Sequence, residues 1–385
     1  MDELYYSLSH LASSVRNQIP CEPLKAPSFP GTSHFVCVLR FEDGVEWVAR
    51  VSSKALSLKC PLPQEDIDRF ASEISTLRWL KEKTSVKVPK LYAWNIPGPR
   101  NLAASDVSSG PQVLNTDSIP WMMVEKLTGV SLTYEMWNGF TDMERQKILA
   151  QVADLYAELS RHPFPEIGSL HTEPEPPYAT RTHPRIYRYS FASAPVVPTD
   201  LLSLTATYRS TMPSITDPAI RGIISDIHQG LLANNPFPKE FFLAHPDLNP
   251  TNIILDPQSL LIAGFIDWDC AHTVSPMEFC IHPWFIQDRW YVDWDSEGLT
   301  RNQRDRDWFT AYIRTKTKTV QGSSKIQDRY DLANGFEQSL GVYLFGQFLH
   351  DTVCINPETL SAMYSKLEPV IQGYRQSLKP QQVGK

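Results

Sequence analysis

Four polar side chains in one short stretch, His245, Asp247, Asn252 and Asp267, have types and spacing suited to phosphoryl transfer. Transfer of a γ-phosphoryl group passes through a loose transition state, so a protein mainly positions groups and neutralises charge. We expect Asp247 to orient an attacking hydroxyl and to accept its proton. Carboxylate and amide oxygens suit Mg²⁺, so Asn252 and Asp267 are expected to hold that ion against the phosphates. His245 is expected to brace the loop by hydrogen bonding.

A β-hairpin must bring these side chains together. FFLA predicts a buried strand, and the two prolines of HPDLNPTN exclude a helix and predict a rigid loop. NIILD and LIAGFI flank a turn and predict the two strands of a hairpin. Because the outer ends of paired strands meet, Asn252 and Asp267 should be neighbours, with Asp247 on the loop before them. The alternative is that these polar residues are only turn formers, since Asp, Asn and Pro are common in turns.

The pattern H-x-D-x-x-x-x-N followed by I-D-W-D resembles the aminoglycoside phosphotransferase and choline kinase group of protein kinase-like enzymes. It is most similar to the phosphotransferase-enzyme branch abundant in fungal genomes, and the likeness covers most of residues 31–275. The resemblance implies an α+β, two-lobed protein kinase-like fold. A small β-rich N-lobe would span residues 1–125, and a larger α-rich C-lobe would span 126–385. ATP would bind between the lobes with Mg²⁺, and Asp247 and His245 would form the catalytic loop.

Arg50, in WVARV, stands where a kinase carries its phosphate-clamping lysine. Arginine keeps the charge and adds a planar fork, but it is not equivalent to lysine. Residues 65–80 predict a helix, and Glu73 falls on its apolar face. Burying a lone charge is costly, so we expect Glu73 to pair with Arg50. The alternative is a carboxylate that bends out to water.

The strands FVCVLRF and VEWVARVS, joined by the turn Glu-Asp-Gly, would cover the nucleotide in the resembled fold. A full G-x-G-x-x-G is absent because only Gly31 is present. Ser33 is therefore the candidate phosphate contact, and an ordinary turn is the alternative. The resemblance also makes PWMMVEKLTG the hinge, where Glu125 would supply a carbonyl and Leu127 an amide to adenine.

Other segments predict helices and loops. Thr141 and Glu144 form a capping box that opens a helix. Residues 162–216 are proline-rich and predict an irregular insertion. A long loop is expected over 95–119, and helices are expected over 301–320, 326–350 and 357–377.

Composition limits the partners. The chain has 385 residues, is 42% hydrophobic and carries a net charge of −7 without a basic run. Such a chain is globular, and its charge disfavours nucleic acid and anionic membrane and leaves room for a cationic acceptor. No leader pattern or long apolar span is visible, and the six cysteines lack a CxxC pair. We expect a cytoplasmic protein with reduced thiols.

The acceptor is expected to be the hydroxyl of a small molecule, because no A-P-E segment of a protein kinase follows Asp269. An aminoglycoside, a choline-like amine, a sugar and a secondary metabolite all remain open. Aromatic and acidic residues from Trp284 to Asp295 would suit an ammonium group, although packing of the C-lobe is the favoured interpretation. A catalytically silent kinase-like nucleotide-binding or scaffold protein is the alternative function, because the Gly-rich loop is missing and Arg50 replaces lysine.

Overall fold

The computed structural model describes most of the chain, in the following segments and single positions: residues 2–24, 34–57, 62–97, 119–172, 180–183, 240–288, 296–320 and 330–337, with 218, 221, 222, 225, 229 and 339. The strands are β1 (Cys21–Pro23), β2 (His34–Phe41), β3 (Glu46–Ser52), β4 (Leu91–Asn95), β5 (Trp121–Glu125), β6 (Val130–Ser131), β7 (Gly168–Thr172), β8 (Thr180–His183), β9 (Phe242–Ala244), β10 (Ile253–Leu255), β11 (Ile262–Phe265) and β12 (His272–Val274). The helices are α1 (Asp2–Val15), α2 (Ser53–Ser57), α3 (Gln64–Lys83), α4 (Tyr134–Gly139), α5 (Asp142–Leu159), α8 (Pro276–Phe279) and α9 (Ser296–Val320), with 3-10 turns η3 (Pro250–Asn252) and η4 (Trp284–Ile286).

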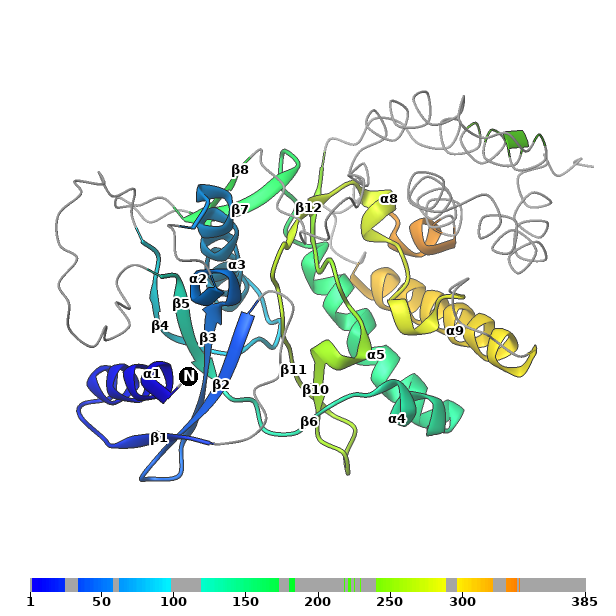
Figure 1. Cartoon of the computed structure of the whole chain (residues 1–385). Helices are drawn as coiled ribbons and strands as arrows, with labels where there is room; N and C mark the ends of the chain where they lie inside the picture. Colours follow the sequence, from blue (N-terminus) through cyan, green and yellow to red (C-terminus); the bar gives the residue numbers. More distant parts are fainter. Residues whose placement is uncertain are drawn as a thin grey trace, which may run out of the picture.

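An antiparallel sheet forms the N-terminal part of the molecule, with strand order β1-β2-β3-β5-β4. In β2, every second side chain from Phe35 to Phe41 is buried, which is the period that places one face of a strand on a core. Helix α1 covers this face with Leu4, Leu8 and Ala12. Figure 1 shows the sheet and α1 on one side and helices α4, α5 and α9 on the other.

The hairpin β10–β11 joins these two parts. Ile253 pairs with Phe265, and the turn is held by Asp256, whose Oδ1 accepts from two backbone amides. On one side the Phe265 amide donates to the Lys87 carbonyl at 2.9 Å. On the other side the Ile262 amide donates to Oε1 of Gln151 on α5 at 2.8 Å. The predicted hairpin is therefore present and is fixed to both parts of the fold.

Another sheet has the strand order β8-β7-β12-β9. Two of its strands flank the hairpin in the sequence: β9 ends just before His245, and β12 begins shortly after Asp269. The expectation of an irregular insertion over 162–216 is wrong at β7 and β8, which are strands. Strand β7 pairs with β12 and β8 pairs with β7, and such tertiary context overrides a weak local pattern. Residues 173–179 and 184–216 lie outside the described part.

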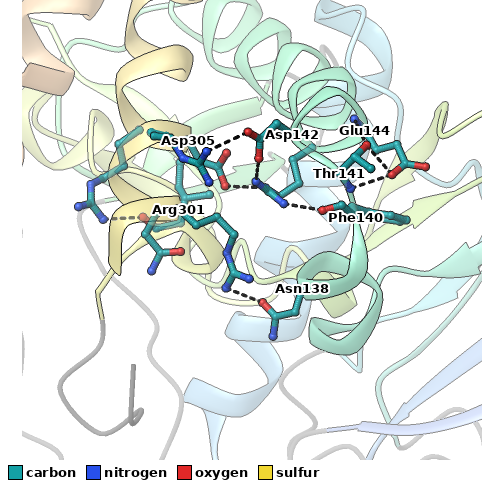
Figure 2. Close-up of polar contacts among 12 residues, drawn as sticks. Asn138, Phe140, Thr141, Asp142, Glu144, Arg301 and Asp305 are labelled. Atoms are coloured by element: carbon teal, nitrogen blue, oxygen red, sulfur yellow. Dashed lines mark hydrogen bonds and ion pairs between the residues drawn. The ribbon is translucent and has the colours of Figure 1, made fainter. Parts of the chain in front are cut away.

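Helices α5 and α9 pack through a buried arginine. The capping box of Thr141 and Glu144 is confirmed. Nε of Arg145 donates to Asp305 at 2.9 Å, and its other nitrogens donate to Asp142 and to the Phe140 carbonyl. Figure 2 shows these labelled partners between the two helices. Each side of this guanidinium meets an acceptor, which is the condition under which a buried charge is tolerated.

Several expected elements differ in extent or fall outside the described residues. The strand predicted over 88–94 begins only at Leu91. Residues 332–337 are helical, whereas the rest of 326–350 is not described apart from Tyr330, Asp331 and Ser339, and neither is 357–377. Most of the loop over 95–119 is likewise outside. Within the described segments, no helix is long and apolar enough to cross a membrane.

Candidate active site

His245 braces the loop that follows β9. Its Nδ1 accepts from the Asp247 amide at 3.2 Å, and its Nε2 lies 2.9 Å from the Ile266 carbonyl. The first contact requires an unprotonated Nδ1, so the proton is on Nε2 and the ring is neutral. Burial lowers the pKa of His245, which agrees with this neutral form. The ring packs 4.7 Å from that of Trp268, so the loop is tied to both sides of Asp267.

Asn252 is the residue that connects the loop to the hairpin. Its Nδ2 donates to the Asp247 carbonyl at 2.8 Å and lies 3.5 Å from the Asp247 carboxylate. The backbone carbonyl of Asn252 accepts from the Ile266 amide at 2.9 Å. The expectation that prolines exclude helix is wrong for one turn, η3. Pro250 begins that turn, where the missing N–H has no partner to lose.

Asp267 follows β11 with a backbone φ of +63°, in the left-handed region that few residues other than glycine adopt. Its carboxylate is about one-third exposed, and Oδ1 accepts from Nη2 of Arg50 at 2.7 Å. The Ile266 amide fixes the preceding residue against Asn252. The hairpin therefore brings Asp247, Asn252 and the chain leading into Asp267 together, as the pattern predicts.

Arg50 is held by three elements. Nη1 donates to Glu73 on α3, and Nη2 contacts both Asp267 and Nδ1 of His34, the latter at 3.0 Å. The predicted pair with Glu73 is confirmed as a contact. Burial raises the pKa of Glu73, and Arg50 opposes that rise. Burial alone would lower the pKa of Arg50, but Glu73 and Asp267 raise it above its ordinary value.

A second ion pair, which sequence reasoning missed, lies beside the first. Nε of Arg69 is 3.4 Å from Oδ1 of Asp269, and both side chains are buried. Burial raises the pKa of Asp269, and Arg69 opposes that rise. The signal was available, because Arg69 lies four positions before Glu73 and residues at that spacing share a helix face. Helix α3 thus contacts the acidic corner directly through Arg69, and it is connected to Asp267 through the pair of Glu73 and Arg50.

The oxygen donors at this corner fit Mg²⁺. Nδ2 of Asn252 is bonded to the Asp247 carbonyl, so its amide oxygen faces away from that carbonyl. With the Asp267 carboxylate this gives two hard oxygen ligands, and Mg²⁺ usually takes one or two protein carboxylates with phosphate oxygens and waters. Among the described residues, no three His, Cys, Asp or Glu side chains gather as a metal site. The residues therefore fit an ion that is held jointly with a phosphate ligand.

Three predicted site residues, Ser33, Glu125 and Leu127, are left to consider. Ser33 lies outside the described residues. The Glu125 amide donates to the Lys90 carbonyl, and the Glu125 carboxylate accepts from the Lys90 amide. The Leu127 side chain packs so closely on Gly264 that a Cβ there would lie 2.6 Å from it. The adenine contacts of Glu125 and Leu127 stay predictions.

Of the residues suggested for a cationic acceptor, Trp284 is 40% exposed, whereas Asp288 is buried. The Asp288 carboxylate accepts from Arg306 and Asn302. It therefore serves packing of the C-terminal part, the interpretation that the sequence favoured. Residues 289–295 lie outside the described part.

Residues 38–278, more than half of the chain, match the family described as the phosphotransferase enzyme family. The chain belongs to this family. The match confirms the predicted phosphotransferase class and the family that the H-x-D-x-x-x-x-N and I-D-W-D patterns resemble. An alcohol group as the acceptor is part of the proposed function. The narrower fungal branch stays a prediction.

Solved structures confirm the kinase-like fold. The GDP complex of wild-type aminoglycoside 2'-phosphotransferase-IIIa is similar, with 16% identity, coverage of 97% of this chain and 100% of that chain, and a TM-score of 0.53. A putative aminoglycoside phosphotransferase from Ralstonia eutropha shares 14% identity, with 97% and 98% coverage and a TM-score of 0.50. Plasmodium vivax ethanolamine kinase shares 14% identity, with 97% and 89% coverage and a TM-score of 0.50. No curated protein compared with the chain matches it significantly.

Proposed function

We propose that this protein is an ATP- and Mg²⁺-dependent small-molecule kinase that phosphorylates a hydroxyl of a small acceptor. The observation that carries the proposal is the meeting of Asp247 and Asn252 at the end of hairpin β10–β11, directly beside the chain that leads into Asp267. Nucleotide use is supported by the neighbours, since one was solved with GDP. Mg²⁺ is supported by the oxygen donors of Asn252 and Asp267.

The chain's residues take distinct parts in the reaction. Asp247 accepts the proton of the acceptor hydroxyl while that oxygen bonds to the γ-phosphorus. The bond from this phosphorus to the bridging oxygen breaks, and ADP leaves. His245 holds the Asp247 amide and so fixes the base on its loop. Asn252 and Asp267 would hold Mg²⁺, which would neutralise part of the phosphate charge.

Residues of the N-terminal part of the molecule are assigned to nucleotide binding. Arg50, steadied by Glu73, places a fixed positive charge beside Asp267, where the phosphates would meet the metal. Ser33 is proposed to contact phosphate, and Glu125 and Leu127 are proposed to bind adenine. We retain the two-lobe division at residue 125, which is the last residue of β5. The acceptor class stays open, with a cationic molecule favoured by the net charge of −7. A cytoplasmic location also stays a prediction.

The test uses the full chain with ATP, Mg²⁺ and fractions of a metabolite extract, and it follows the mass gain of one phosphate on an acceptor. We expect Asp247→Asn to lower turnover by about 10²–10⁴-fold while keeping nucleotide binding. Asp267→Asn is expected to remove the Mg²⁺ dependence of ATP binding. A phosphorylated product made equally well by Asp247→Asn would contradict the assigned base.

A catalytically silent nucleotide-binding or scaffold protein remains the second candidate. The observation that favours it is the contact between Arg50 and Asp267, which engages the proposed metal ligand. This candidate predicts tight ATP binding without Mg²⁺ dependence and no product with any fraction.

A further inference from the structure

His34 lies on the same face of the sheet as Arg50. It begins β2 and pairs with Ser52, while Arg50 pairs with Val36. In an antiparallel pair, residues offset in this way are diagonal neighbours within reach of long side chains. His34 is 5% exposed, and its ring packs 5.3 Å from that of Phe70 on α3. Sequence reasoning gave His34 no role, although it follows directly after the Gly-Thr-Ser segment.

The Arg50 guanidinium has enough N–H donors to contact His34, Asp267 and Glu73 at once. Nη2 carries two hydrogens, and it lies 2.7 Å from Oδ1 of Asp267 and 3.0 Å from Nδ1 of His34. Nη1 donates to Glu73 on the other side of the fork. Nδ1 of His34 accepts only when it carries no proton. Burial lowers the pKa of His34 well below its ordinary value, and the charges of Arg50 and Arg69 lower it further.

We propose that His34 is a positioning residue that sets the plane of the Arg50 guanidinium. A guanidinium is planar, so the acceptors that its N–H groups can reach depend on how that plane is rotated. An ammonium group has no plane to fix. With His34 as acceptor, one edge of the fork meets Glu73 and the other faces Asp267. His34 therefore accompanies the arginine that replaces the lysine of other kinases, and a lysine at position 50 would not need it. The effect on nucleotide binding rests on the proposed function, but the contact does not.

The test is a double-mutant cycle on the full chain. His34→Leu, Arg50→Lys and the double variant are compared for the Kd of ATP with Mg²⁺, by calorimetry. We expect His34→Leu to weaken binding about tenfold in the arginine background and less than about twofold in the lysine background. His34→Asn keeps an acceptor oxygen near the position of Nδ1, so it should bind within about threefold of the wild type. His10→Asn, an exposed histidine on α1, is the matched control and should leave Kd unchanged.

Equal losses in the two backgrounds would overturn the proposal, because His34 would then act independently of Arg50. If no variant and no wild-type protein binds ATP with Mg²⁺, the proposed function fails. The same four proteins then test the contact through their urea unfolding midpoints. Non-additive shifts support the His34–Arg50 contact, and additive shifts overturn it. His34→Ala replaces His34→Leu in both cycles if the leucine variant does not fold.

Discussion

Nη2 of Arg50 on β3 lies 2.7 Å from Oδ1 of Asp267, at the far end of the hairpin β10–β11. The other terminal nitrogen of the same guanidinium donates to Glu73 on α3. One side chain therefore connects the N-terminal sheet, its neighbouring helix and the acidic corner. Because Glu73 is fully buried, we expect Arg50 to stabilise the fold in addition to its proposed role at the site.

Replacing Arg50 with methionine should leave Glu73 buried without its cation. Breaking a buried pair in this way costs about 3–5 kcal/mol of the free energy of unfolding. Burial already raises the pKa of Glu73, and loss of Arg50 raises it further. The folded state then favours the protonated acid, so stability is retained at low pH and is lost as pH rises through the raised pKa. The wild type shares this pH dependence up to its own Glu73 pKa of about 8, so in urea unfolding the loss of Arg50→Met relative to the wild type should be larger at about pH 9 than at about pH 5.

The double variant Arg50→Met, Glu73→Gln is the control for this prediction. A neutral amide at position 73 leaves no buried charge without a partner, so most of the pH-dependent loss of stability should disappear. A double variant that is as pH-sensitive as Arg50→Met would show that another group causes the effect.

The two acids of the I-D-W-D segment should differ in function. Asp269 is buried with Arg69, whereas Asp267 is about one-third exposed at the proposed metal site. Asp269→Ala leaves Arg69 without its counter-charge and should lower the free energy of unfolding by about 3 kcal/mol. Asp267→Ala should change stability less and should remove the Mg²⁺ dependence of ATP binding. Chemical unfolding and calorimetric titration of both variants check the contrast, and equal effects on stability would contradict it.

Sequence reasoning could place the hairpin β10–β11 because the pattern that predicts it is local. Apolar runs, a turn and two polar ends within one short stretch determine that Asn252 and the chain before Asp267 meet. Glu73 could be assigned inward because helical periodicity fixes its face. The cost of a buried charge required a partner, the resemblance to kinases indicated Arg50, and the contact is present.

What could not be predicted depends on contacts between distant segments. Strand β7 forms by pairing with β12, and its own residues carry no alternating pattern. The role of His34 depends on the register between β2 and β3 and on the rotation of one guanidinium. The helix face of Arg69 could be inferred from its spacing to Glu73, but its partner Asp269 lies at a corner far along the chain. None of these contacts between distant segments can be predicted from a local periodicity or spacing in the sequence.

Gly129 should be intolerant of a side chain. Its φ is +133°, and a Cβ there would lie 2.4 Å from the carbonyl oxygen of Leu255, a residue of β10 in the hairpin. Both atoms in conflict are held by backbone, so Gly129→Ala should cost about 3 kcal/mol or more through strain and overpacking. Thermal and urea unfolding measure the loss. Gly139→Ala is the matched control, because a Cβ at Gly139 meets nothing within 4 Å; equal stability of the two variants would contradict the prediction.

His282 should make the stability of the C-terminal part depend on pH. Its ring contacts the hydroxyls of Thr310 and Ser339 and packs against Phe309 and Phe336. Burial, with a smaller effect of Arg306, lowers the pKa of His282 to about 3. The unfolded chain takes up a proton below a pKa of about 6.5, whereas the folded chain does not until the lower value. Stability is therefore present above about pH 6.5 and falls as pH drops toward the folded pKa.

The pH effect can be isolated by replacing the imidazole. Between about pH 7.5 and pH 5, His282 should remove on the order of 2 kcal/mol from the free energy of unfolding, since one pKa unit is worth about 1.4 kcal/mol. His282→Asn loses ring packing at every pH, but it has no group that titrates in this range. Urea unfolding at several pH values should therefore show a flatter pH dependence for His282→Asn than for the wild type. Because every other histidine is common to both proteins, their contributions cancel in the difference. Parallel curves would show that His282 does not stay neutral in the fold.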